Sequence, residues 1–146
     1  MSDATEKIQL LKDAIEKRVQ SVDSKRMYYR KQSLTMFTAS TILSAIITIL
    51  LGLKIPELNE FVRLTALIIS TTLTIINGYN AFFNYRDLWL ANNMARNKLY
   101  SLQFSIEFME KGGAITNDNA DSLKNTYQDI IDELNAGWEK SKLSKK

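Results

Sequence analysis

The sequence predicts an all-α membrane protein: a two-helix transmembrane hairpin with an N-terminal amphipathic helix and two C-terminal cytoplasmic helices. Residues 34–53 and 64–83 contain no charged side chain, and each run of twenty residues is long enough, as a helix rising about 30 Å, to cross the hydrocarbon core of a bilayer. Elsewhere apolar residues recur at three- and four-residue steps, and no strand-like alternation occurs. A buried helical hairpin in a soluble protein is the alternative, but a chain of 146 residues has little core in which to hide two such runs.

Residues 1–33 form the amphipathic helix in this prediction. One face carries apolar residues at helical spacing, and charged residues fill the others. The apolar face consists of Ile8, Leu11, Ile15, Val19 and Val22. No glycine or proline separates this helix from the first span, so we expect it to run directly into the membrane.

The hairpin occupies residues 34–83, with spans at 34–53 and 64–83. Gly52 and Pro56 are stop signals for the first span, and residues 54–63 form a short outer link. An aromatic belt where the second span leaves the bilayer is predicted for Tyr79, Phe82, Phe83, Tyr85 and Trp89.

Residues 84–146 form the cytoplasmic helical region, and the helical pattern continues into it from the second span without a break. A coiled-coil-like seam contains Leu88, Asn92, Ala95, Leu99, Leu102, Ile106 and Met109. We predict that Leu88, Ala95, Leu99, Leu102 and Ile106 join copies of the chain as an oligomer seam. Phe104 and Phe108 lie on another face, so the helix is expected to pack on two sides, against its own partners and against another subunit.

The glycine pair Gly112-Gly113 ends this helix, and Asn119 or Asp121 caps a last one. The apolar stripe of the last helix consists of Leu123, Tyr127, Ile130, Leu134 and Trp138.

The distribution of charge predicts the orientation. Seven basic residues lie next to the two inner ends of the spans, whereas the link has two, Lys54 and Arg63. Basic residues favour the cytoplasmic side, so both termini are expected in the cytoplasm and the link outside.

Composition argues against several classes of function. The chain has no cysteine and no histidine, so it lacks the usual zinc and haem ligands and the commonest general base near neutral pH. It has no glycine-rich phosphate loop and no nucleophile elbow. We therefore expect no enzyme, no metal and no cofactor. Residues 84–146 contain nine basic and nine acidic residues, so this region has no net positive charge that would attract nucleic acid.

The spans carry fourteen Ser, Thr, Asn and Tyr residues in forty positions. Asn77, Asn80 and Asn84 lie on one side of the second span, and buried amides in hydrocarbon need partners. These polar residues either line a pore or bond between helices, and both interpretations require more than one copy. The candidate positions are Ser70, Thr74, Asn77, Asn80 and Asn84 of the second span and Thr41, Ser44 and Thr48 of the first.

Small residues also recur at four-residue steps in both spans, which favours close helix packing. The two stripes are Ser40, Ser44, Thr48 and Gly52, and Ala66, Ser70, Thr74 and Gly78.

The order of these parts resembles the SMODS- and SLOG-associating two-transmembrane effectors (SLATT). Residues 89–108, with Arg96, Leu99, Tyr100, Leu102 and Glu107, look like the helix that follows the membrane in such proteins, and the last helix ending near Trp138 fits as well. The resemblance implies a pore-forming or membrane-perturbing effector of a prokaryotic conflict system. It also implies a separate nucleotide-producing or nucleotide-sensing partner.

We therefore expect a homo-oligomeric effector in membrane lipid, in the prokaryotic inner (plasma) membrane. The alternative is a membrane-anchored scaffold whose cytoplasmic helices recruit a partner protein. The polarity of the spans favours the effector, because a simple anchor has no use for it.

Overall fold

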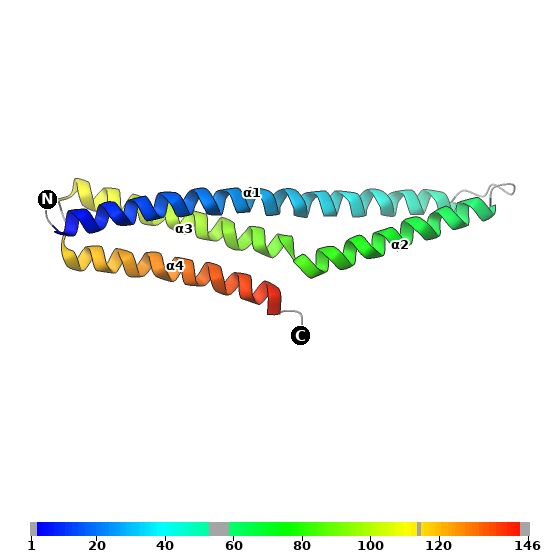
Figure 1. Ribbon diagram of the computed structural model, residues 1–146. Coiled ribbons are helices and arrows are strands. Elements are labelled where there is room, and N and C mark those ends of the chain that lie inside the picture. Colours follow the sequence, from blue (N-terminus) through cyan, green and yellow to red (C-terminus); the bar gives the residue numbers. More distant parts are fainter. Residues whose placement is uncertain (1–2, 53–58, 114, 144–146) are drawn as a thin grey trace.

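The computed structural model describes residues 3–52, 59–113 and 115–143, and four helices account for almost all of them (Figure 1). They are α1 (Asp3–Gly52), α2 (Asn59–Phe83), α3 (Tyr85–Lys111) and α4 (Asn117–Leu143). No strand occurs within these ranges, so the all-α prediction is confirmed.

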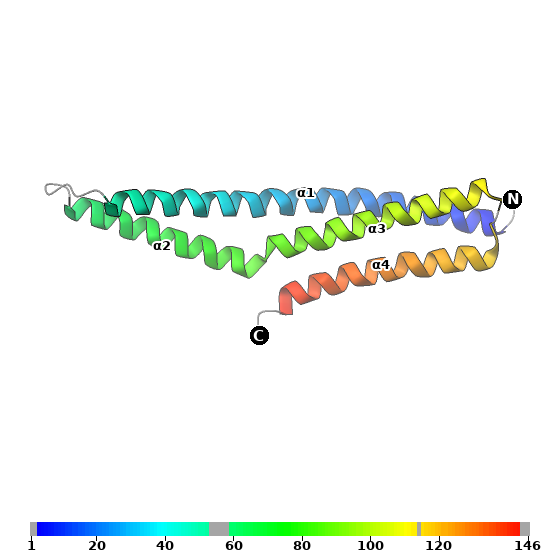
Figure 2. The ribbon, with the colours of Figure 1, turned by 180° about the vertical axis from the view of Figure 1, so that it is seen from behind.

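Helix α1 is a single helix of 50 residues, about 75 Å long. It contains both the predicted amphipathic helix and most of the predicted first span, and the predicted boundary between residues 33 and 34 falls inside it. Helices α2 and α3 follow one another in the opposite direction along its side (Figures 1 and 2). The predicted link at 54–63 lies partly outside the described residues, including Pro56, and its last residues belong to α2.

The helix does not continue from α2 into α3, so the prediction of an unbroken run is wrong at one residue. Asn84 has φ 44° and ψ 50°, which is the left-handed region. Its backbone nitrogen donates to the carbonyl of Asn80 at 2.9 Å, and its own carbonyl accepts from Asp87 at 3.1 Å. Asparagine enters this region more readily than most residues, and the chain bends here (Figure 1).

Three helices form a bundle at one end of the molecule: the N-terminal half of α1, α3 and α4. The predicted apolar faces meet in its core, and Ile15 and Leu99 are fully buried there. The core residues are Ile8, Leu11, Ile15, Val19, Val22, Ala95, Leu99, Leu102, Ile106, Ala120, Leu123, Ile130 and Leu134. Most of the predicted apolar positions are therefore buried in this core, whereas Met109, Tyr127 and Trp138 are partly buried against it and Ala120 was not predicted.

The glycine pair ends α3 as predicted, with Gly112 at the C-cap and Gly113 at φ 65°. Helix α4 begins earlier than predicted, at Asn117. The hydroxyl of Thr116 accepts the backbone N–H of Asn119 at 3.2 Å, so Thr116 is the cap in place of Asn119 or Asp121. Threonine fills this position well because its oxygen reaches the third helical N–H.

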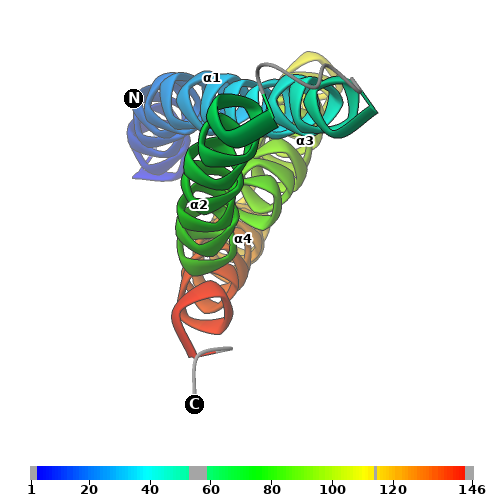
Figure 3. The same cartoon turned by 90° about the vertical axis from the view of Figure 1, so that its right-hand side faces the viewer.

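The C-terminal half of α1 and α2 form the other end of the molecule, here called the apolar pair. Both helices are long and apolar enough to span a membrane, and 0% and 6% of their most apolar windows are buried inside the molecule. Helix α4 ends near the bend between α2 and α3 and does not run beside α2 (Figure 1), and in the end-on view α1 lies at the top and the C-terminal end of α4 at the bottom (Figure 3). The exposed apolar surface of the apolar pair includes Phe37, Ile49, Leu67 and Ile75.

Candidate functional site

Most hydroxyl groups of the predicted polar site bond within their own helix. Each donates to the backbone carbonyl four residues earlier, a local arrangement that satisfies the hydroxyl in an apolar medium. The donors and acceptors are Thr41 to Phe37 (2.9 Å), Thr48 to Ser44 (2.9 Å), Ser70 to Ala66 (2.7 Å) and Thr74 to Ser70 (3.0 Å). These hydroxyls therefore require neither water nor another helix.

The asparagines of α2 are different, because a side-chain amide has more groups to satisfy. The hydroxyl of Ser40 on α1 donates to the Oδ1 atom of Asn77 at 2.9 Å, which joins the two helices of the apolar pair. The amide NH₂ of Asn77 and the whole side-chain amide of Asn80 have no hydrogen-bond partner within the described residues. An unpaired amide in hydrocarbon costs several kcal/mol, about 4–8 by cyclohexane transfer, so these groups call for a partner or for water.

Asn84 does not lie with them. Its Nδ2 atom donates to Asp87 at 2.5 Å across the bend between α2 and α3. The structure thus separates the predicted set into a bend residue, four self-bonded hydroxyls, the hydroxyl of Ser44 and the two amides of Asn77 and Asn80. Thr41, Ser44, Thr48 and Thr74 are exposed to the outside of the apolar pair, and Ser70 is half-buried.

The small-residue stripes follow the contact between α1 and α2 for only part of their length. Ala66 is buried and Ser40 is half-buried, but Ser44, Thr48 and Thr74 are exposed. An added Cβ atom at Gly52 or Gly78 would meet nothing within 4 Å. Four residues of helix turn about 40° beyond a full circle, so each stripe winds away from the contact.

The predicted oligomer seam lies inside the core of a single chain. Leu88, Ala95, Leu99, Leu102 and Ile106 have exposed fractions between 0% and 7%. A second copy reaches these residues only if the helices of one chain separate. The surface that is available to another copy lies on the opposite side of α3.

That opposite side, here called the outer face of α3, is apolar and exposed. Phe104 and Phe108 are 69% and 72% exposed, and their rings stack with centroids 6.4 Å apart. The guanidinium of Arg96 lies 5.4 Å from the ring centre of Tyr100. The face consists of Leu90, Met94, Tyr100, Phe104 and Phe108. One side of α3 is thus packed as predicted, and the other is open.

Aromatic side chains of α1, α2, α3 and α4 gather around Tyr29 and Tyr85. Tyr29 stacks on Tyr85 at 6.2 Å and meets Trp138 of α4 edge-on at 5.9 Å, while Phe83 stacks on Tyr85 at 5.5 Å. The hydroxyls of Tyr79 and Tyr85 lie 3.4 Å apart. Bonding to Tyr79, with burial second, raises the pKa of Tyr85 to about 12. The sequence predicted an interfacial aromatic belt here, but Tyr85, one of its rings, is buried inside the molecule.

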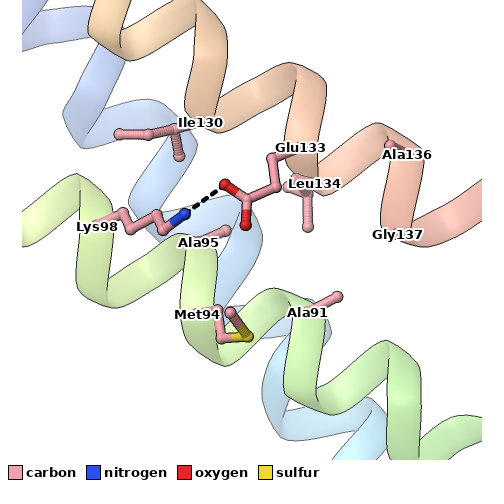
Figure 4. Close-up of a pocket in the computed structure, with 9 residues that line it drawn as sticks. All are labelled: Ala91, Met94, Ala95, Lys98, Ile130, Glu133, Leu134, Ala136 and Gly137. Atoms are coloured by element: carbon pink, nitrogen blue, oxygen red, sulfur yellow. Dashed lines mark hydrogen bonds and ion pairs between the residues drawn. The ribbon is translucent and has the colours of Figure 1, made fainter.

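A cavity of about 250 Å³ lies between α3 and α4 (Figure 4). Small side chains line much of it, and the ion pair between Lys98 and Glu133 crosses it. An added Cβ at Gly137 would come within 3.3 Å of the Cβ of Ala91, so the two helices approach closely at that point. Within residues 3–52, 59–113 and 115–143, no three metal-ligating side chains come together.

Comparison of the chain with protein-family models, curated proteins and solved structures gives no match. The resemblance to the SLATT effectors therefore depends on the order and spacing of the helices.

Proposed function

We propose that this chain is a two-span membrane protein whose copies assemble around a polar path through the bilayer. The observation that carries the proposal is the NH₂ group of Asn77 and the whole side-chain amide of Asn80, which lack hydrogen-bond partners within the described residues at the depth of the apolar pair. Copies of the chain, or water between them, would satisfy these groups.

Three further properties support this arrangement. The apolar windows of α1 and α2 are almost wholly unburied, as lipid-facing helices require. Seven basic residues against two favour cytoplasmic termini with the link outside. In that orientation the three-helix bundle lies in the cytoplasm, and the outer face of α3 offers apolar surface to a neighbouring copy.

The biological role proposed here is that of an effector which permeabilises the inner membrane in a prokaryotic defence system, triggered by a separate nucleotide-linked protein. Support for this role comes from the likeness of the helix order to the SLATT effectors. The alternative is a membrane-anchored scaffold. The self-bonded hydroxyls and the Ser40–Asn77 bond favour it, because they suit a closed pair of helices that needs no water.

A leakage assay separates the two functions. The purified protein would be reconstituted at a high protein-to-lipid ratio, so that assembly does not await a trigger, and release of a small dye would be followed. We expect the wild type to release dye and Asn77→Leu and Asn80→Leu to suppress release, because an apolar lining raises the barrier to ions and water.

Thr71→Leu is the matched control. Thr71 lies on the exposed side of α2, and its hydroxyl bonds to the carbonyl of Leu67 at 2.9 Å. This variant is expected to leak like the wild type. A silent wild type would favour the scaffold, and asparagine variants that leak normally would remove Asn77 and Asn80 from the lining.

A further inference from the structure

A second cavity, of about 480 Å³, lies within the bundle between α1, α3 and α4. Its volume is in the range of small-molecule sites. Arg18, Ser21 and Lys25 line it from α1, Asn92 from α3, and Asn135 and Trp138 from α4. None of these residues has a role in the proposed polar path.

The cavity has two cationic side chains that no carboxylate neutralises within the described residues. Neighbouring Arg26 and Arg96 share Asp23, at 2.9 and 3.4 Å, whereas Arg18 and Lys25 form no ion pair there. The Nζ atom of Lys25 lies 5.7 Å from the ring centre of Trp138. The one acidic residue in the lining is Glu139, which is exposed. A doubly charged anion suits this pair, because a guanidinium binds two oxygens side by side and an ammonium acts as a point charge.

Two buried polar atoms of residues that line the cavity also lack partners within the described residues. Asn92 is 1% exposed, and its Nδ2 atom donates to the carbonyl of Leu88 at 2.7 Å. Its Oδ1 atom accepts no hydrogen bond within the described residues, and the Nε atom of Arg18 is unpaired in the same way. Buried polar groups without partners are rare in folded proteins, since each carries a desolvation penalty. The Asn92 oxygen requires a donor, such as a hydroxyl group.

We infer that this cavity binds a small phosphate monoester that carries hydroxyl groups. The phosphate lies with Arg18 and Lys25, and a ligand hydroxyl donates to Asn92. Phosphate could also come from a lipid headgroup, but the distance argues against that source. Lys25 precedes the first span by nine residues, or about 13 Å of helix, whereas the headgroup layer extends only about 5–8 Å beyond the hydrocarbon. This choice of a soluble ligand rests on the proposed membrane placement.

Occupancy of the cavity would act next to the bend at Asn84. Trp138 lines the cavity and meets Tyr29, which in turn stacks on Tyr85, the first residue of α3. A ligand that fixes the position of Trp138 therefore also fixes the aromatic contact beside the bend.

The test is titration of the full-length protein in detergent micelles with glucose 6-phosphate, inorganic phosphate and glucose. Trp89→Phe leaves Trp138 as the only tryptophan, so its fluorescence reports on this cavity. We expect saturable binding of glucose 6-phosphate, weaker binding of inorganic phosphate and none of glucose. Calorimetry on the chain with both tryptophans is expected to agree.

Arg18→Gln and Lys25→Gln are each expected to weaken binding of glucose 6-phosphate by about tenfold or more. Arg30→Gln is the control, because Arg30 is an exposed arginine of the same helix outside the lining. Circular dichroism of each variant shows whether the bundle is folded. If Arg18→Gln unfolds, Lys25→Gln still tests the inference, because Lys25 lies at the exposed rim of the cavity.

Absence of saturable binding by any soluble phosphate overturns the inference, as does equal loss in Arg30→Gln. A response only to nanodiscs that contain phosphatidylglycerol also overturns it, in favour of a headgroup. None of these binding measurements depends on leakage. A negative binding result therefore does not contradict the polar path, and the absence of leakage does not contradict the binding site.

Discussion

Tyr85 sits among three other aromatic rings at the first turn of α3, and its hydroxyl meets that of Tyr79. Its pKa of about 12 lies above the ordinary value of 10.0. The protonated phenol is therefore favoured in the folded protein. Its contribution to the free energy of unfolding is complete below pH 10 and is lost as the pH rises towards 12.

Comparison with Tyr85→Phe isolates this contribution. The variant keeps the stacked ring but has no proton to lose. We expect a constant difference in melting temperature below pH 10 and a steeper loss of stability in the wild type above it. Parallel pH profiles for the two proteins would show that the hydroxyl is not linked to folding.

Asn84 is the one residue other than glycine with a positive φ in the described part of the chain. We expect Asn84→Ala to destabilise the protein by about 1 kcal/mol, because a Cβ atom in the left-handed region lies too close to the following carbonyl. Asn84→Gly removes that clash and is expected to remain near wild-type stability. Thermal unfolding in detergent measures both.

Asn97→Ala serves as the reference for Asn84. Asn97 is exposed in the middle of α3, where alanine is the better helix former, so this change is expected to be neutral or slightly stabilising. If Asn97→Ala lowered the free energy of unfolding as much as Asn84→Ala, the left-handed conformation of Asn84 would not explain its loss of stability.

At the scale of elements, α3 has two apolar sides, one buried in the core of the chain and the other exposed. The spacing of apolar residues predicted the core faces of α1, α3 and α4, including Ile15, Leu99 and Ile130, because burial follows helical periodicity. Periodicity does not say which molecule covers a face. For that reason the residues of the predicted seam proved to be buried within one chain, while Phe104 and Phe108 remain open.

Substitutions on the two sides of α3 are expected to behave differently. Leu99→Ala removes a fully buried side chain and is expected to cost about 3 kcal/mol of unfolding free energy. Phe104→Ser, at a side chain 69% exposed, is expected to change stability by less than about 0.5 kcal/mol but to reduce the size of the assembly. Chemical unfolding and light scattering after gel filtration measure the two effects. An assembly that keeps its size in Phe104→Ser would place the contact between copies elsewhere.

The bend at Asn84 and the hydrogen bond of Asn77 are two features that the spacing of apolar residues does not predict. Apolar spacing continues through Asn84, so periodicity carries no sign of a single left-handed residue. The bond between Ser40 and Asn77 depends on the register of α1 against α2. That register is set by packing along both helices, which no short segment specifies.

For the whole molecule, the charge distribution makes a prediction about orientation. The chain contains no cysteine, so a single introduced cysteine is a unique label. In intact cells we expect an impermeant reagent to label Glu60→Cys, at the start of α2, and to label Lys124→Cys, in α4, only after permeabilisation. The opposite result would reverse the orientation while leaving the fold unchanged.

The unbroken α1 has a mechanical consequence. Its bundle half is stiff, about 45 Å long and continuous with the half in the apolar pair, so it acts as a lever. A change of about 10° in the tilt of the half in the apolar pair carries the far end of the bundle half through about 8 Å, and the same change in the bundle half moves the far end of the apolar pair through about 5 Å. The return path through α2 and α3, by contrast, is interrupted by the left-handed residue Asn84. Force applied to the bundle thus reaches the far end of the apolar pair through one rigid rod.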